Sequence, residues 1–101
     1  MDTYIRVYRV APLPDMGTEE FETFVIENVL PLVDMGPTRG GQLTDVSFLK
    51  ETGATRKDRY LWMIEWEGTN AEWVGLKLEE AVNKLDSVGM RISSLLLTPL
   101  D

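Results

Sequence analysis

Strand-like and helix-like segments follow one another along the chain in the order strand–helix–strand–strand–helix–strand, and this order predicts an α+β fold. The βαββαβ order is that of the ferredoxin-like arrangement, in which a four-stranded antiparallel sheet carries both helices on one face. The chain has 101 residues without repeats or low-complexity tracts, so we expect residues 1–101 to form a single domain.

The four predicted strands are rich in β-branched and aromatic residues, and their side chains alternate in character. They span Thr3–Val10, Gln42–Lys50, Arg59–Glu67 and Met90–Thr98. Strict alternation predicts that Leu43 lies on the face opposite Val46, and that Arg91 lies on the face opposite Ser94. The polar segment 51–58 is predicted to be a hairpin loop.

The first predicted helix starts near Thr18, which is a plausible N-cap, and its regular turns end near Pro31. An α-helical spacing of about 100° per residue places one apolar stripe along it. The stripe consists of Phe21, Phe24, Val25, Val29 and Leu32. The second predicted helix begins with a capping box, Thr69 to Glu72, and extends to about Ser87.

The third and fourth predicted strands are apolar on both faces, although both helices are expected on one face of the sheet. Nothing else in the chain is predicted to cover the second face. A second copy of the same chain is the economical cover, so we expect a homodimer that associates through its sheets into an α+β barrel.

Composition excludes several classes of function. There are 17 acidic and 10 basic side chains, a net charge of −7, and no cysteine or histidine. Disulfides, thiolate nucleophiles, Ser–His catalysis and the common zinc and haem sites are therefore excluded. The acidic balance argues against nucleic acid as a partner. No signal peptide or membrane-spanning run is evident, which predicts a cytoplasmic protein with no membrane partner.

An aromatic face is the first candidate site. Tyr60, Trp62 and Trp66 recur at every second position, as do Tyr4 and Tyr8 around Arg6. The first and third strands are neighbours in this topology, so these residues could line one surface. Aromatic walls with one arginine suit a flat, oxygen-bearing ligand such as a phenol, quinone or polyketide. The alternative is packing in the core of a dimer.

Two further candidates lie on the helices. Asn28 falls inside the first apolar stripe, where a buried amide either orients a ligand carbonyl or bonds to backbone or water. Trp73 and Leu76 form an apolar pair on the polar side of the second helix. The pair is either an interface or lid, or a tryptophan lying over the Lys77 stem or the end of the sheet.

The charged candidates favour the surface. Glu65 and Glu67 share a strand face, and Glu79 and Glu80 lie on the second helix, without a spacing that forces a metal site or a catalytic acid pair. We expect no bound metal. The basic run 56–59 is either a solvated turn or a contact for an anionic partner or substrate.

The element order, the run Val29-Leu30-Pro31-Leu32, the glycine-rich loop after it and Trp66 closing the third strand resemble the dimeric α+β barrel superfamily. That superfamily contains antibiotic-biosynthesis-monooxygenase-like and stress-response A/B-barrel domains. Many monooxygenase-like members have Glu two residues before the strand-three Trp, where this chain has Ile64. Many also carry a His in the second helix, and haem-degrading members use a His as a haem ligand. This chain has no histidine, so the resemblance does not imply a haem oxygenase activity here.

The resemblance allows a cofactor-independent monooxygenase, cyclase or isomerase acting on a small aromatic or polyketide-like molecule. Trp62 and Trp66 would be its walls, and Asn28 would orient the ligand. Arg6 would stabilise an enolate or phenolate, and Tyr8 could donate a proton. No cofactor is required if the substrate supplies the electrons. The alternatives are a non-enzymatic homodimer that binds a ligand or acts in stress, and a structural dimer without a pocket.

Overall fold

The structure is a computed structural model, which describes residues 2–52 and 60–100. The predicted hairpin tip and the basic run 56–59 lie outside these residues. The strands are β1 (Asp2–Pro12), β2 (Gly41–Lys50), β3 (Tyr60–Gly68) and β4 (Gly89–Leu97). The helices are α1 (Thr18–Phe24), continued by a π-helical turn (Val25–Val29) and a 3₁₀ turn (Leu30–Leu32), then α2 (Trp73–Lys77) and α3 (Glu79–Asp86).

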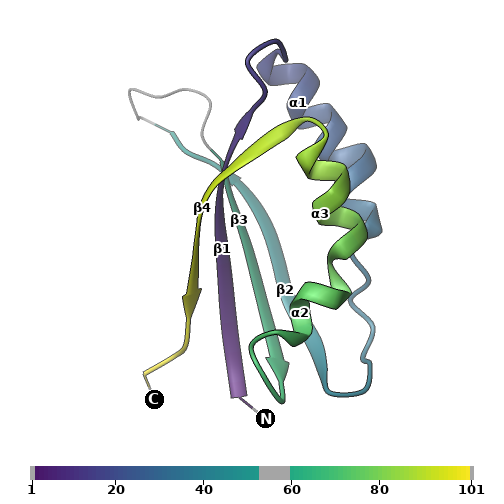
Figure 1. Ribbon diagram of the computed structural model, residues 1–101, viewed down its shortest axis with the longest axis vertical. Helices are drawn as coiled ribbons and strands as arrows, with labels where there is room; N and C mark the ends of the chain where they lie inside the picture. Colours follow the sequence, from purple (N-terminus) through teal and green to yellow (C-terminus); the bar gives the residue numbers. More distant parts are fainter. Residues whose placement is uncertain (1, 53–59, 101) are drawn as a thin grey trace.

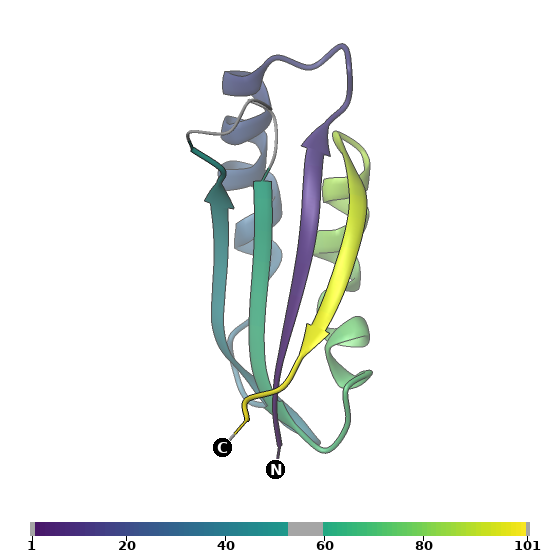
Figure 2. The same ribbon diagram turned by 90° about the vertical axis from the view of Figure 1, so that its left-hand side faces the viewer.

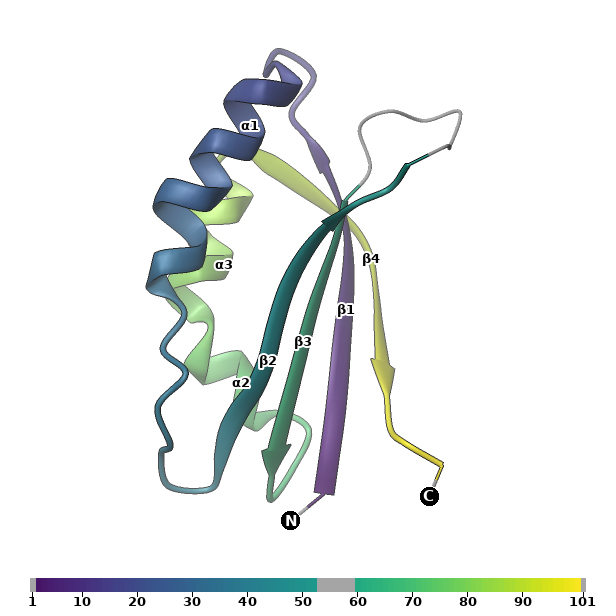
Figure 3. The same ribbon diagram turned by 180° about the vertical axis from the view of Figure 1, so that it is seen from behind.

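The four strands form one antiparallel sheet in the order β2-β3-β1-β4 (Figures 1 and 2). All helices lie on one side of it, as Figure 3 shows from behind. The predicted ferredoxin-like α+β fold is therefore confirmed. None of the helices in the described part of the chain has the length and apolar character needed to span a bilayer.

The core lies between the helices and the sheet. The sheet contributes one face of β3, whose residues Tyr60, Trp62, Ile64 and Trp66 are at most 2% exposed. The helices contribute the buried residues Phe21, Val25, Val29, Val74, Leu78, Ala81 and Leu85. The alternation predicted for β3 is confirmed, and it places the two tryptophans directly under the helices.

Two irregularities in strand pairing correct the predicted faces of β2 and β4. The register between β2 and β3 shifts between Leu43 and Asp45, so that Leu43 pairs with Trp66 and joins Val46 on the helix-facing side. The register between β1 and β4 shifts between Arg9 and Val10, and Arg91 then pairs with Val10. Arg91 therefore lies on the same side as Ser94. A β-bulge adds one residue to one strand, which reverses the alternation beyond it.

The first helix changes its winding after Phe24, and this corrects the prediction for Asn28. Hydrogen bonds in a π-helical turn run from i to i+5, so the chain rotates less per residue than in an α-helix. Phe21, Val25 and Val29, spaced by four residues, then face the core, whereas Asn28 is exposed. The regular turns end in the 3₁₀ turn that contains Pro31, as the missing N–H of proline predicts.

The second helical segment starts later than predicted and is divided. The predicted capping box at Thr69–Glu72 is wrong, because α2 begins only at Trp73. The Glu72 amide instead donates to Oδ1 of Asn70. Leu78, with φ −105° and ψ 6°, separates α2 from α3.

Trp73 lies over the end of the sheet, which supports the second of the two interpretations of this residue. A Cβ added to Gly41 would come within 3.0 Å of the Trp73 ring, and one added to Gly40 within 3.4 Å. Gly40 has φ +96°, a conformation that favours glycine. The side chain of Leu76, the other member of the predicted apolar pair, is not among the described side chains.

The sheet face away from the helices carries six apolar residues on three strands: Ile5, Val7, Leu61, Met63, Leu95 and Leu97. Val7 pairs with Met63 and with Leu95, whereas Ile5 pairs with Glu65 and Leu61 pairs with Arg9, so charged side chains lie among them. Leu95 is 59% exposed and Leu97 43% exposed, and no helix in the described part of the chain lies on this side (Figure 1). We call these six residues the open face.

Candidate functional site

The predicted aromatic face is present, and strand register builds it. Tyr4 pairs with Trp66 and Tyr8 with Trp62, so each pair lies on one side of the sheet. The ring centroids are 5.5 Å apart in the first pair and 5.9 Å in the second. Arg6 lies between the two tyrosines, opposite Ile64. This row faces the helices, so packing, the alternative to a ligand site, would place it in the core of one chain, between its sheet and its helices.

Three buried N–H groups of the row have no hydrogen-bond partner in the described residues. They are Nε of Arg6 and the indole Nε1 atoms of Trp62 and Trp66. Both tryptophan side chains are 0% exposed. A buried donor without a partner costs roughly 1–3 kcal/mol, so such groups in a folded protein require an explanation. Three donors on one face, flanked by aromatic rings, form a surface that can bind oxygen atoms of a flat ligand.

The β1 residues of the row lie beside an exposed strand, β4. Every residue of β4 after Gly89 is exposed, including Leu96 and Ser94 on the helix-facing side, whereas Tyr4, Arg6 and Tyr8 on β1 are half-buried. β4 bends away from the helices in Figure 1, and its helix-facing residues Ser94 and Leu96 are exposed. The inner side of β4 therefore leads to the half-buried β1 residues of the row, behind which Trp62 and Trp66 are 0% exposed.

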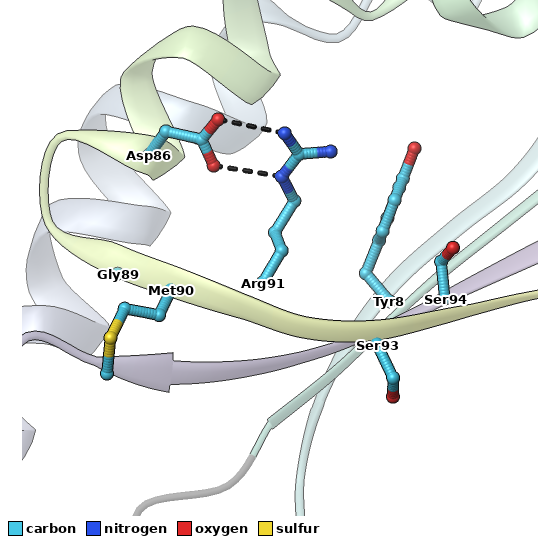
Figure 4. Close-up of a pocket in the computed structure, with 7 residues that line it drawn as sticks. All are labelled: Tyr8, Asp86, Gly89, Met90, Arg91, Ser93 and Ser94. Carbon is cyan, nitrogen blue, oxygen red and sulfur yellow. Dashed lines mark hydrogen bonds and ion pairs between the residues drawn. The ribbon is translucent and has the colours of Figure 1, made fainter.

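A hollow of about 440 Å³ lies at this edge (Figure 4). Its lining residues are Tyr8, Asp86, Gly89, Met90, Arg91, Ser93 and Ser94. Asp86, Arg91, Tyr8 and Ser94 stand on one side of the β4 ribbon, while Met90 and Ser93 point to the other. Its size is in the range of small-molecule sites.

Arg91 joins the end of α3 to β4. Its Nε donates to Oδ1 of Asp86 at 2.9 Å and its Nη2 donates to Oδ2 at 3.0 Å. The guanidinium carbon lies 5.4 Å from the centre of the Tyr8 ring. These hydrogen bonds to Asp86 raise the pKa of Arg91 above its usual value; burial partly opposes this rise, and the nearby Tyr8 adds to it. Sequence reasoning missed this pair because the bulge in β4 brings Arg91 to the inner side.

The structure does not bring Asn28 to this site. Its side chain is exposed on the π-helical turn, while the residues of that turn that reach the core are Val25 and Val29. Of the five predicted site residues, Arg6, Tyr8, Trp62 and Trp66 share one surface.

A smaller crevice, of about 120 Å³, lies between α1 and the ends of β2 and β3. Oε2 of Glu22 accepts hydrogen bonds from Nζ of Lys50 at 3.1 Å and from the Tyr60 hydroxyl at 2.9 Å. These two hydrogen bonds lower the pKa of Glu22. The glutamate is thereby held in its ionised form as a surface bridge between α1 and the sheet.

The other acidic residues lie apart. Glu65 lies on the outer side of β3, where Oε1 accepts from the Thr44 hydroxyl at 2.8 Å. Glu79 and Glu80 are exposed at the start of α3. Across residues 2–52 and 60–100, no three acidic side chains come together as a metal site.

Acid should destabilise the fold through Asp34 as well as Glu22. The amide of Gly36 and Nζ of Lys77, at 2.9 Å and 3.3 Å, lower the pKa of Asp34. A carboxyl whose pKa is lower in the folded state adds stability above its unfolded pKa, and this stability is lost as the pH falls through the folded value. We therefore expect Asp34→Asn to be less stable than the wild type at pH 7. The difference should begin to shrink near the ordinary aspartate pKa of about 4 and should disappear below the lowered pKa of Asp34 in the folded protein.

Urea unfolding at several pH values measures this difference. The exposed Asp15, replaced by Asn, is the matched control and should follow the wild type throughout. A difference between Asp34→Asn and the wild type that is independent of pH would contradict the assignment.

Comparison with solved structures shows the same fold in an enzyme. The chain superposes on SnoaB, a cofactor-independent oxygenase from Streptomyces nogalater, with a TM-score of 0.70 and 17% identity, covering 100% of this chain and 96% of that one. A single-substitution mutant of SnoaB gives a TM-score of 0.68 at 15% identity, with the same coverage of both chains. No family model and no curated protein sequence matches the chain.

Proposed function

We propose that this protein is a cofactor-independent monooxygenase- or cyclase-like enzyme that acts on a small aromatic or polyketide-like molecule between the helices and the sheet. One observation carries the proposal: Arg6, Trp62 and Trp66 present buried N–H donors without partners on one aromatic surface. A flat molecule with phenolic or carbonyl oxygens would pair these donors and stack on Tyr4 and Tyr8.

The residues of the row have separate roles in this proposal. The Arg6 guanidinium and the indole N–H groups stabilise negative charge on a phenolate or enolate oxygen, which makes the ring a better electron donor. Tyr8, beside Trp62, donates a proton. In a balanced reaction of this class, a phenol and one molecule of O₂ give a quinone and one molecule of water. The substrate is then oxidised, and O₂ is the only oxidant required.

Two facts about similar proteins support the proposal. SnoaB, which shares the fold, is described as a cofactor-independent oxygenase. The sequence also resembles the antibiotic-biosynthesis-monooxygenase-like domains, and we extend that resemblance to the placement of this chain in the dimeric α+β barrel superfamily.

Quenching of tryptophan fluorescence tests the site. We expect saturable quenching by hydroxylated aromatics or quinones at micromolar concentration, because two of the three tryptophans lie in the row. Arg6→Ala should weaken the affinity roughly tenfold or more, the effect of one lost hydrogen bond to a charged donor. Arg39→Ala, an exposed arginine in the loop before β2, should have no effect.

Oxygen uptake, measured on the same proteins and ligands, distinguishes an enzyme from a binding protein. Oxygen uptake that requires both the bound phenol and Arg6 supports the enzyme. Binding without oxygen uptake or product favours the non-enzymatic ligand-binding dimer. If no ligand of these classes quenches the fluorescence, the row is a packed core and the proposal is wrong.

The proposed homodimer rests on the open face. Leu95 and Leu97 are exposed beside Val7 and Ile5 of β1, and a second copy placed on this face would cover them in a self-complementary contact. Light scattering at micromolar concentration should report twice the chain mass of 11.5 kDa. Leu95→Glu should shift the protein toward the monomer, whereas Asn83→Glu on exposed α3 should not. A wild-type mass of one chain would contradict the dimer.

A further inference from the structure

The pair of Arg91 and Asp86 lies outside the aromatic row but adjoins it. Tyr8 belongs to both places, since its ring lies near Trp62 at 5.9 Å and near the Arg91 guanidinium at 5.4 Å, and it also lines the hollow at the β4 edge. A ligand seated on Tyr8 would thus extend from the row into the hollow.

Asp86 binds two of the three guanidinium nitrogens of Arg91, and Tyr8 is the other side chain that interacts with this arginine. The carboxylate accepts from Nε and Nη2, and the third nitrogen, Nη1, projects toward the Tyr8 side of the hollow (Figure 4). A guanidinium held at two of its nitrogens is a rigid donor, so a hydrogen bond from the third loses little conformational freedom. Ser94, which pairs with Tyr8 across the strands, places a hydroxyl on the same side.

The charge of the hollow selects the ligand group. The positive charge of Arg91 is already balanced by Asp86, and the whole chain has a net charge of −7. A phosphate or free carboxylate would approach Asp86 without a net positive charge to balance it. A carbonyl or phenolic oxygen, in contrast, needs only the N–H and O–H donors that the hollow offers.

Strand geometry sets the size of the ligand. Arg91 pairs with Val10, four residues along β1 from Arg6. At about 3.3 Å per residue, the two arginines are separated by roughly 13 Å along the strand. A ligand that contacts both has the length of three or more fused rings.

On this basis, and building on the proposed function, we propose that Arg91 is a specificity residue. It binds, through Nη1, a carbonyl or phenolic oxygen at the end of a planar polycyclic aromatic ligand whose other end lies on Arg6, Trp62 and Trp66. Asp86 is a positioning residue, because it acts through Arg91.

A pair of probes that differ by one oxygen tests this inference. Dissociation constants for 2-hydroxyanthraquinone and anthraquinone are measured by fluorescence quenching in the wild type and in Arg91→Met. We expect the wild type to prefer the hydroxylated probe roughly tenfold or more. In Arg91→Met this preference should vanish while the affinity for anthraquinone is kept. Asp86→Asn, which leaves the arginine but loosens it, should give an intermediate preference.

Controls separate recognition from structure. Arg39→Met, on an exposed arginine, should keep the full preference. Urea unfolding checks that each variant is folded; if Arg91→Met fails this check, Arg91→Lys replaces it, since lysine lacks the planar fork. The inference is overturned if a folded Arg91 variant keeps the preference, or loses affinity equally for both probes. If the wild type binds neither probe but binds a smaller phenol or quinone, this inference is wrong and the proposed function stands; if it binds none of these ligands, both are wrong.

Discussion

Replacing Trp66 by alanine is expected to lower the free energy of unfolding by about 3–5 kcal/mol, the usual cost of removing a large buried aromatic side chain. Trp66 is 0% exposed and stacks on Tyr4 at 5.5 Å, so the loss leaves a cavity in the core between the sheet and the helices. Because domains of this size have only about 5–15 kcal/mol of stability, urea unfolding should show a large fall in the midpoint. An unchanged midpoint would contradict the burial of Trp66.

Trp66→Phe separates packing from recognition. Phenylalanine keeps most of the ring but lacks the unpaired Nε1 donor, so the lost packing is partly offset by removal of a buried unsatisfied group. We expect a folded protein with a small change in stability and a clear loss of affinity for oxygenated aromatics. Trp73→Phe, over the glycine turn outside the row, is the control and should bind normally. Normal binding by Trp66→Phe would show that Nε1 does not contact the ligand.

Gly41→Ala is expected to destabilise the protein by about 3 kcal/mol, at the upper end of the usual cost of overpacking. Its Cβ would lie 2.7 Å from the backbone oxygen of Glu67 and 3.0 Å from the Trp73 ring. The first neighbour is part of the β2–β3 pairing and cannot move without disturbing the sheet. The loss should appear as a lower midpoint in both thermal and urea unfolding.

Gly75→Ala is the matched control for this substitution. A Cβ at this helical position meets nothing within 4 Å, and alanine favours the helix over glycine by roughly 0.5–1 kcal/mol. We expect this variant to be as stable as the wild type or slightly more stable. If both variants lost the same stability, the close approach at Gly41 would not be the cause of the destabilisation.

The sequence predicts the elements and their order because hydrophobic alternation is a local signal. Tyr60, Trp62, Ile64 and Trp66 define a strand and its buried face, and the structure agrees. The bulges near Leu43 and Arg91 could not be predicted, since a bulge depends on how two strands fit together. The same holds for the capping box at Thr69, where the chain turns through Asn70 before α2 starts.

The candidate site was predicted in part for the same reason. Arg6, Tyr8, Trp62 and Trp66 follow from strand period and strand order, both of which are regular. α-Helical winding would place Asn28 in the buried stripe, but the chain leaves that winding after Phe24. Arg91 and Asp86 meet only through the bulge and the path of the chain between α3 and β4.

The π-helical turn at Val25–Val29 also affects how this chain is aligned with other sequences. A π turn, closed from i to i+5, holds one residue more than an α turn. A relative whose helix winds regularly there would therefore be one residue shorter at this point, and the residues on either side would still face the same core. An alignment without a gap would pair every position after the turn with the wrong face of the helix, and a single-residue gap within 25–29 would restore the match.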